Sequence, residues 1–320
     1  MNQNRTYQAA VNYRKDPKNS LMAALLYINR HKFIYLLLVP GVIYFLIFQY
    51  GPLYFLQVAF KEYNIFLGLQ GSKWVGFQNF QRLFTTKFFM QAFSNTVIIS
   101  LMYKVFAFPA PIIISLFLNE LRSQRFKRIV QTIIYLPHFL SWVIVGGIFI
   151  TILSPAGGLV NELLGLVGIK PIAFMTSKAW FRWILVLSDI WKSCGWGTII
   201  FLAAISTIDA ELYESAVIDG AGRFRQMWSI TLPCIMPTII VVFVLSLAKV
   251  LNLFEQVFVM YNPLVSAVSE TIDTYVYIRG IEQADIAFAT TAGLFKNIIT
   301  VTLILITNQI VKIFQGETVI

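Results

Sequence analysis

The chain has 320 residues, of which 58% are hydrophobic and 12% are charged, and its net charge is +10. Soluble domains carry about 25% charged residues, so the composition excludes an ordinary soluble domain and indicates a protein embedded in lipid. An excess of lysine and arginine in such a protein sets the orientation of its membrane spans. We therefore infer contact with membrane lipid and no nucleic-acid partner.

Six apolar runs are each long enough to cross the hydrocarbon core as a helix, which needs roughly 20 residues. They occupy residues 33–60, 88–119, 129–161, 183–208, 237–261 and 286–311. The sequence thus predicts an all-α membrane protein with about six transmembrane helices. A basic arm at 1–32 precedes the membrane domain at 33–312, and a short tail at 313–320 follows it.

The distribution of positive charge predicts the orientation of these spans. With six spans both termini lie on one side, and that side carries 13 lysines and arginines against 8 on the other. Because short cytoplasmic loops are enriched in lysine and arginine, we expect both termini and the 209–236 loop to be cytoplasmic. The strongest single contribution comes from one short loop, which holds Arg122, Arg125, Lys127 and Arg128.

The 209–236 loop is far more polar than the apolar runs beside it. The Asp219 carboxylate suits the N-cap of a helix that begins near Gly220, since it can accept backbone N–H bonds there. Pro233 and Pro237 are predicted to end this helix before the fifth span. Residues spaced by three and four give the helix one apolar face, made by Ala221, Phe224, Met227 and Trp228.

A shorter apolar stripe comes before Gly220 and consists of Leu212, Tyr213, Ala216 and Val217. Two short helices joined at a glycine would present an apolar ridge to the cytosol. Such a ridge fits a groove in another protein, and physics alone equally allows an amphipathic helix that rests on the lipid surface.

One spaced motif in this loop separates the two interpretations. The loop reads Glu214-Ser215-Ala216, three residues, Gly220, nine residues, and Ile230-Thr231-Leu232-Pro233. It resembles the EAA loop of binding-protein-dependent importers of the ATP-binding-cassette (ABC) class, with Ser215 as the only departure from the family's Glu-Ala-Ala. The resemblance favours docking to a protein. The residues expected to couple the chain to an ATPase are Glu214, Ala216, Asp219, Gly220, Ala221, Phe224, Met227, Trp228, Ile230, Leu232 and Pro233.

Other motifs extend the resemblance over nearly the whole chain. They include Tyr50-Gly51-Pro52, Trp74-Val75-Gly76-Phe77, Phe108-Pro109-Ala110 and Tyr135-Leu136-Pro137-His138. Together they are similar to the polysaccharide subgroup of carbohydrate permeases, close to the first permease subunit of alginate-oligosaccharide importers. The resemblance implies a type I ABC importer-like permease of the bacterial inner membrane, with its EAA loop as a cytoplasmic coupling helix.

The same resemblance implies the partners of the chain. They are a second permease subunit that completes a heterodimer, two ABC ATPase subunits, and an extracytoplasmic solute-binding protein, which the acidic 262–288 loop would meet. The chain has no Gly-x-x-x-x-Gly-Lys-Ser/Thr loop to cradle phosphates. ATP and Mg are therefore expected in the partner ATPases, and no catalytic residue, metal site or cofactor is expected in this chain.

Ionisable residues within the predicted spans are costly and are candidates for function. Asp189 and Lys192 are three residues apart, so they share a helix face and can neutralise each other. Lys104 and Lys296 could line an aqueous path and attract an anionic sugar such as a uronate. They could equally pair with acids on neighbouring helices, and both alternatives stay open.

Sugar sites combine aromatic plates with a few hydrogen-bonding groups, and the fourth and fifth spans carry both. The family's sugar-contacting positions lie on these two spans. The run Leu251-Asn252-Leu253-Phe254 resembles its Phe-Asn-x-Phe stretch, so Asn252 carries over best. Tryptophan and tyrosine near span ends also serve as interface anchors. The candidates for the substrate path are Trp191, Lys192, Trp196, Asn252, Glu255 and Tyr261.

We therefore expect a permease subunit of an ATP-driven importer that translocates an oligosaccharide by alternating access. The basic residues at depth favour an acidic, alginate-like sugar. One alternative is a secondary transporter that acts alone and is driven by protons or sodium through Glu255, Asp189 and the lysines within the spans. Another is a membrane enzyme acting on lipid-linked sugars, which would need an acid/base arrangement that the sequence does not offer.

Overall fold

The computed structural model describes residue 27 and residues 30–315. Most of the predicted basic arm at 1–32, and residues 316–320 of the predicted tail, lie outside the described residues. The chain divides into two compact units, Met1–Gln57 and Val58–Ile320.

The described part of the first unit consists mainly of a long apolar helix. It begins with α3 (Lys32–Phe45), passes through a π-helical turn at Leu46–Tyr50, and continues as a 3-10 helix, Gly51–Phe60, into the second unit. The side chains of α3 are all exposed or half-buried within the chain. An apolar helix of 29 residues with so little internal packing fits a lipid or partner-helix environment.

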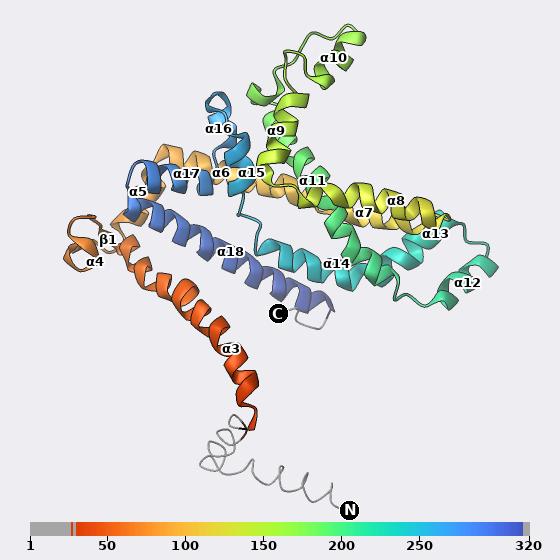
Figure 1. Ribbon diagram of the computed structural model, residues 1–320, viewed down its shortest axis with the longest axis horizontal. Helices are drawn as coiled ribbons and strands as arrows, with labels where there is room; N and C mark the ends of the chain where they lie inside the picture. Colours follow the sequence, from red (N-terminus) through yellow and green to blue (C-terminus); the bar gives the residue numbers. More distant parts are fainter. Residues whose placement is uncertain (1–26, 28–29, 316–320) are drawn as a thin grey trace, which may run out of the picture. The chain divides into compact units, whose positions relative to one another are not determined.

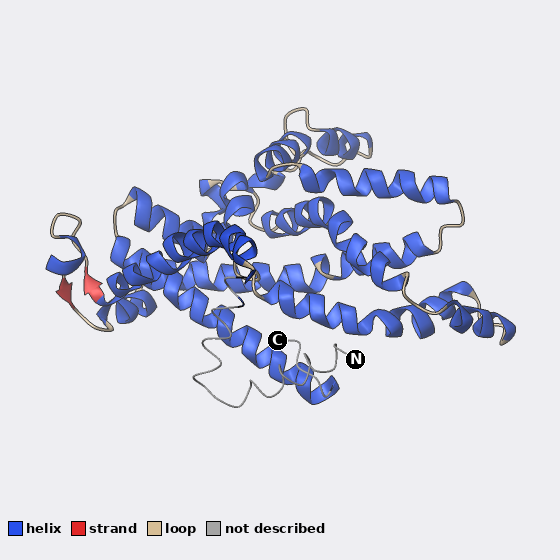
Figure 2. Ribbon diagram, turned by 60° about the horizontal axis from the view of Figure 1, so that its bottom comes forward, coloured by secondary structure: helices blue, strands red, loops and turns tan. Residues whose placement is uncertain are grey.

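The described part of the second unit consists of helices joined by loops, with one short hairpin (Figures 1 and 2). Its strands β1 and β2 pair antiparallel, with Lys61 opposite Trp74 and Glu62 opposite Lys73. The elements in chain order are β1 (Lys61–Glu62), α4 (Gly68–Gly71), β2 (Lys73–Trp74), α5 (Gln78–Thr85), α6 (Lys87–Met102), α7 (Pro109–Asn119), α8 (Gln124–Tyr135), α9 (Trp142–Ile152), α10 (Leu159–Leu166), α11 (Phe181–Ile205), α12 (Ala210–Ile218), α13 (Arg223–Gln226), α14 (Leu232–Leu247), α15 (Phe254–Met260), α16 (Ser266–Ser269), α17 (Ile272–Tyr277) and α18 (Ile286–Gln315).

Three buried apolar clusters hold the second unit together. One joins α6, α11 and α15 around Phe181 and Val257. The second joins α5, α6, α17 and α18 around Phe89 and Phe288. The third joins α7, α11 and α14 around Ile235. Figure 1 shows α12 and α13 at one end of this unit and α5 and α17 at the other.

The prediction of about six spans is confirmed, with two corrections to their form. Five continuous helices are long and apolar enough to cross a membrane, namely Lys32–Phe60, Lys87–Asn119, Phe181–Ile205, Arg223–Leu247 and Ile286–Lys312. The predicted third span at 129–161 is wrong as a single helix, because Gln124–Phe139 and Trp142–Ile152 meet at 105°. The Ser141 hydroxyl accepts a hydrogen bond from the Ile144 N–H and so caps a new helix at this bend.

The fifth span also differs from its predicted range of 237–261. The helix already begins at Arg223 and ends at Leu247. Residues 248–253 are not helical, and α15 starts at Phe254. The prolines do not interrupt this span: Pro233 directly follows a π-helical turn at Met227–Thr231, and Pro237 lies within α14. Helices in membranes tolerate such prolines where neighbouring groups satisfy the freed carbonyls.

Candidate functional site

The loop that resembles the EAA motif begins with a capped helix. The Asp209 carboxylate accepts a hydrogen bond of 3.0 Å from the Glu211 N–H and forms the N-cap of α12. At the other end, the Gly220 N–H donates to the Val217 carbonyl (3.0 Å) and the Ala221 N–H donates to the Ala216 carbonyl (2.8 Å). This pair of bonds is a Schellman motif, which needs a left-handed residue at its glycine position.

The prediction that Asp219 caps a helix starting near Gly220 is therefore wrong. Gly220 has φ +76° and terminates α12, so Asp219 is the last residue before the turn and its carboxylate does not cap α13. The second helix starts three residues later, at Arg223, with Gly222 as its N-cap. The signal for this arrangement was present in the sequence, because a glycine after an apolar helical stripe is a common C-terminal cap.

The predicted ridge is only partly exposed. The Phe224 and Trp228 side chains are 70% and 54% exposed and lie near each other, with ring centroids 6.1 Å apart. Met227 is buried against Leu116 and Ile235, so its assignment to the exposed face is wrong. Of the other predicted coupling residues, Glu214, Asp219, Gly220 and Pro233 are exposed and Ala216, Ala221, Ile230 and Leu232 are half-buried.

The loop is fastened to two transmembrane helices. The Tyr213 hydroxyl lies 2.9 Å from the Thr231 hydroxyl, which ties α12 to the start of the helix that continues into α14. The Arg223 guanidinium donates a hydrogen bond of 3.2 Å to the Glu120 carbonyl at the end of α7. Sequence reasoning missed Thr231 as an anchor, because a threonine within an apolar run carries no distinguishing pattern. A force applied to the ridge would reach both spans.

A cavity of about 910 Å³ lies farther along the same helices. Its lining residues come from the π-helical turn Tyr103–Ala107 after α6, from α11, from the bend after α8 with the start of α9, and from the end of α14, the break after it and the start of α15. They are Tyr103, Lys104, His138, Trp142, Asp189, Lys192, Ser193, Trp196, Ser246, Lys249, Val250, Asn252, Leu253, Phe254, Glu255 and Gln256. Four of the predicted substrate-path residues are among them: Lys192, Trp196, Asn252 and Glu255.

The other two candidates lie elsewhere. Trp191 is outside the cavity lining and packs edge-on against Phe149, with ring centroids 5.9 Å apart. Tyr261 lines a separate pocket of about 380 Å³ together with Gln91 and Arg279. Neither residue therefore lines this cavity, because spacing along the sequence cannot tell which way either ring faces.

The structure brings in an aromatic pair at the bend after α8. The His138 imidazole stacks on the Trp196 indole, with ring centroids 4.7 Å apart and an angle of 6° between the planes. Lys192 lies over the Trp142 ring at 5.5 Å. Flat aromatic faces of this kind suit the C–H faces of a sugar ring. His138 stands in the quoted Tyr-Leu-Pro-His motif, and the proline before it was the available signal for a bend.

The two charged residues of α11 bind other groups than each other. The Lys192 ammonium donates to the carbonyls of His138 (2.9 Å) and Leu140 (2.6 Å), which the bend removes from helical hydrogen bonding. The Asp189 carboxylate accepts a hydrogen bond of 3.2 Å from Ser193. The expected mutual neutralisation of Asp189 and Lys192 is therefore not a direct contact. Backbone carbonyls at membrane depth need a hydrogen-bond donor, and Lys192 supplies it here instead of pairing with Asp189.

Two other lysines predicted within spans, Lys104 and Lys296, have different surroundings. Lys104 lines the cavity and donates to the Ser246 hydroxyl (2.7 Å) and carbonyl (3.1 Å). Lys296 pairs with Asp273. The charged residues that line the cavity are three lysines, Lys104, Lys192 and Lys249, and two acids, Asp189 and Glu255.

A buried glutamine fixes the wall of the cavity. Gln256 is 4% exposed and donates to the Leu185 carbonyl (2.7 Å) and the Ser188 hydroxyl (2.8 Å) on α11. Its carbonyl accepts a hydrogen bond from the Tyr103 hydroxyl. The short helix α15 is therefore held to α11 and to the π-helical turn after α6 through polar contacts. These hydrogen bonds stabilise the packing of α15, since an unsatisfied amide in the membrane interior is costly.

Comparison with known proteins gives consistent matches. The family described as "Binding-protein-dependent transport system inner membrane component" matches residues 107–318. Protein LplB of Bacillus subtilis (strain 168) is 46% identical over 299 residues, covering 93% of each chain. The polygalacturonan/rhamnogalacturonan transport system permease protein YteP of the same strain is 42% identical, covering 96% of this chain and 95% of YteP.

The solved structures agree with these relatives. A chain in the crystal structure of a bacterial ABC transporter involved in the import of the acidic polysaccharide alginate superposes with a TM-score of 0.85. It is 39% identical, and the match covers 92% of this chain and 99% of that one. The bacterial alginate ABC transporter in complex with an alginate pentasaccharide-bound periplasmic protein gives a TM-score of 0.84 at 40% identity. The chain belongs to the binding-protein-dependent transport system inner membrane component family and is a multi-pass permease of the ABC importer type.

Proposed function

We propose that the chain is one permease subunit of an ATP-driven importer that carries an acidic oligosaccharide across the bacterial inner membrane by alternating access. Both termini are cytoplasmic in this proposal. Its partners are a second, different permease, two ABC ATPase subunits that hold ATP and Mg, and an extracytoplasmic solute-binding protein. The substrate class is supported by the names of relatives and solved neighbours, which concern polygalacturonan, rhamnogalacturonan and alginate.

The observation that carries the proposal is the connection between the exposed ridge and the cavity. Phe224 and Trp228 are large, apolar and exposed, and they lie on the helix that runs unbroken from Arg223 to Leu247. This helix ends where the cavity-lining residues Lys249 and Asn252 begin. Docking of an ATPase on the ridge would therefore move a wall of the cavity, which is the kind of rigid-body shift that alternates access.

The chemistry of the cavity supports an acidic sugar. The stacked His138 and Trp196 rings offer an apolar platform. Lys104 and Lys249 add positive charge to the lining. The volume of about 910 Å³ falls within the range of ligand cavities, about 300–1,000 Å³.

A truncation of the ridge tests the coupling. Phe224→Ala should reduce co-purification of the ATPase subunits and substrate-stimulated ATP hydrolysis, while the permease stays in the membrane. Phe66→Ala is the matched control, because Phe66 is 96% exposed and lies in the hairpin at the other end of the unit (Figure 1). Equal behaviour of the two variants would contradict the proposal.

A transport assay tests the energy source. The same complex in proteoliposomes should import a labelled uronate oligosaccharide only with ATP and the solute-binding protein, whereas an ion-coupled transporter would transport it as the lone chain under a proton or sodium gradient.

A further inference from the structure

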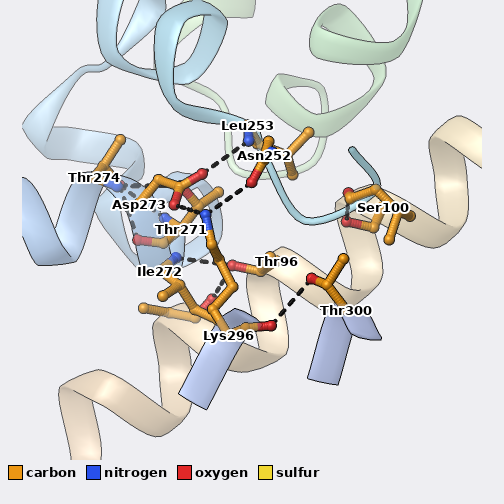
Figure 3. Close-up of polar contacts among 12 residues, drawn as sticks. Thr96, Ser100, Asn252, Leu253, Thr271, Ile272, Asp273, Thr274, Lys296 and Thr300 are labelled. Atoms are coloured by element: carbon orange, nitrogen blue, oxygen red, sulfur yellow. Dashed lines mark hydrogen bonds and ion pairs between the residues drawn. The ribbon is translucent and has the colours of Figure 1, made fainter. Parts of the chain in front are cut away.

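The break in the fifth span is held by side chains from three other helices. Residues 248–253 are not helical, and non-helical backbone at membrane depth needs hydrogen-bond partners from the surrounding protein. The Ser100 hydroxyl of α6 donates to the Val250 carbonyl at 2.6 Å. The Leu253 N–H donates to the Asp273 carboxylate of α17 at 3.1 Å. Both contacts surround the point where the chain enters the cavity lining (Figure 3).

The third contact comes from Lys296 of α18. Its ammonium binds the Asp273 carboxylate and also donates to the Asn252 side-chain oxygen at 2.8 Å (Figure 3). The Lys296 and Asp273 side chains are 13% and 15% exposed. Asn252 lines the cavity, whereas Lys296 and Asp273 are outside its lining. The ion pair therefore meets the cavity through Asn252.

The lysine decides which way the Asn252 amide is turned. A lysine ammonium has three donors and no acceptor, and an asparagine side chain has one oxygen acceptor and one NH2 group with two donors. Only the oxygen of Asn252 can face Lys296 favourably. Among the described residues the Asn252 NH2 group has no hydrogen-bond partner, so its two donors remain for a molecule in the cavity.

We propose that Lys296 and Asp273 are a positioning pair that turns the Asn252 NH2 group toward the cavity and so makes the break a donor site for the carboxylate and ring oxygens of an acidic oligosaccharide. This inference rests on the proposed function. Asp273 neutralises Lys296, so the pair adds no net charge to the site. Its contribution is the direction of the amide, which favours acceptor-rich sugars over sugars with fewer acceptor oxygens.

The first test replaces the ion pair by a neutral pair. Lys296→Met with Asp273→Asn leaves the net charge unchanged, and the amide introduced at position 273 retains an oxygen for the Leu253 N–H. The complete importer in proteoliposomes is given labelled trigalacturonate and, separately, the same trisaccharide with its carboxylates reduced to alcohols. We expect the ratio of uptake rates, acidic over neutral, to fall at least threefold. A purely structural role would lower both rates and leave the ratio unchanged, and that result would overturn the inference.

The second test keeps the ion pair and removes the donors. Asn252→Asp retains an oxygen for Lys296 but has no NH2 group. Ser246→Asp is the matched control, because Ser246 also accepts from a lysine of the cavity, Lys104, and its own hydroxyl proton is already donated to the Phe243 carbonyl at 2.7 Å. Both variants add one negative charge, so the change in charge is the same in each. Only Asn252→Asp removes a donor that is free to bind a sugar.

We expect the concentration of trigalacturonate at half-maximal uptake to rise about tenfold more in Asn252→Asp than in Ser246→Asp. Equal shifts in the two variants would overturn the inference, and this comparison decides the matter if the Lys296/Asp273 double variant fails to assemble. If the wild-type importer carries neither trisaccharide but remains active in ATP hydrolysis, the proposed substrate class is wrong, and that outcome is distinct from equal shifts in the variants.

Discussion

A close helix contact next to the cavity predicts a large effect for a very small substitution. Gly195 of α11 faces the last turn of α8, and a Cβ atom placed on it would lie 2.6 Å from the Ile134 carbonyl carbon and 3.0 Å from the Tyr135 Cα. Both are backbone atoms, so they cannot rotate away. Gly195→Ala therefore requires the end of α8 to move by roughly 1 Å, and overpacking of this kind costs about 1–3 kcal/mol.

Two further terms shape the result for Gly195→Ala. Alanine favours a helix over glycine by up to about 1 kcal/mol, which offsets part of the clash. The displaced turn leads into the bend whose carbonyls bind Lys192, so the cavity is disturbed as well. A net loss of about 1–2 kcal/mol corresponds to a fall of roughly 2–8 °C in the unfolding midpoint, at about 2–4 °C per kcal/mol. The maximal uptake rate should fall with it.

The assay is the thermal unfolding midpoint of the purified importer in detergent, followed by the fraction that elutes as the intact complex. Gly293→Ala on α18 is the matched control, because a Cβ at Gly293 would meet nothing within 4 Å. Its midpoint should stay the same or rise slightly. The close-contact reasoning fails if Gly195→Ala unfolds no earlier than Gly293→Ala.

Three further outcomes follow from the loops. Gly220→Ala places a residue with a Cβ in the left-handed conformation at φ +76°, which costs about 1–2 kcal/mol. This variant should lower substrate-stimulated ATP hydrolysis. Gly222→Ala is the control and should not lower it, because Gly222 has φ −69°. Asp209→Ala removes the N-cap of α12, worth about 1 kcal/mol, and should speed amide exchange in α12 about fivefold; no such change is expected for Asp219→Ala. Burial raises the pKa of the Glu270 carboxyl above its ordinary value, against the opposing charge of Arg279. Because the folded state then binds this proton more tightly, stability from Glu270 is present at low pH and is lost as pH rises from 4.5 through the raised pKa. Glu270→Gln should therefore unfold at a higher temperature than wild type at neutral pH, a difference that disappears in acid.

The sequence predicted the spans well where apolar length alone decides them. The run at 286–311 and the helix Ile286–Lys312 nearly coincide, because a long, predominantly apolar run leaves a helix as the only way to satisfy the backbone in lipid. The same criterion failed at 129–161. Bending there depends on the Ser141 cap and on Lys192, a residue far along the chain that binds the freed carbonyls. A window that moves along the chain cannot include such a partner.

The coupling loop shows a second limit. Asp209 and Asp219 are both reasonable N-caps by residue type, and the choice between them depends on whether Gly220 ends one helix or begins another. Its positive φ decides for the end. For the cavity, Trp196 could be anticipated as an aromatic candidate, whereas His138 could not, since its stacking on Trp196 depends on the bend. Tertiary contacts between distant helices supplied what local patterns lacked.

The two corrected spans share a physical cause that bears on transport. A straight transmembrane helix satisfies all its own backbone groups and offers a passing sugar nothing polar except side chains. The bend after α8 and the break after α14 both open the backbone within the membrane region, and both border the same cavity. The helix Arg223–Leu247 has 25 residues and is thus about 37 Å long at 1.5 Å per residue. It links the exposed ridge at Phe224 directly to the break at 248–253.

If a partner ATPase moves the ridge, we expect the break to be the first part of the cavity to respond, because rigid helices transmit displacement to the point where their hydrogen bonding stops. A spin-label pair placed on α14 and α18 near the break should then change its distance distribution on addition of ATP, whereas a pair on α17 and the start of α18, joined by the Phe89 cluster, should not.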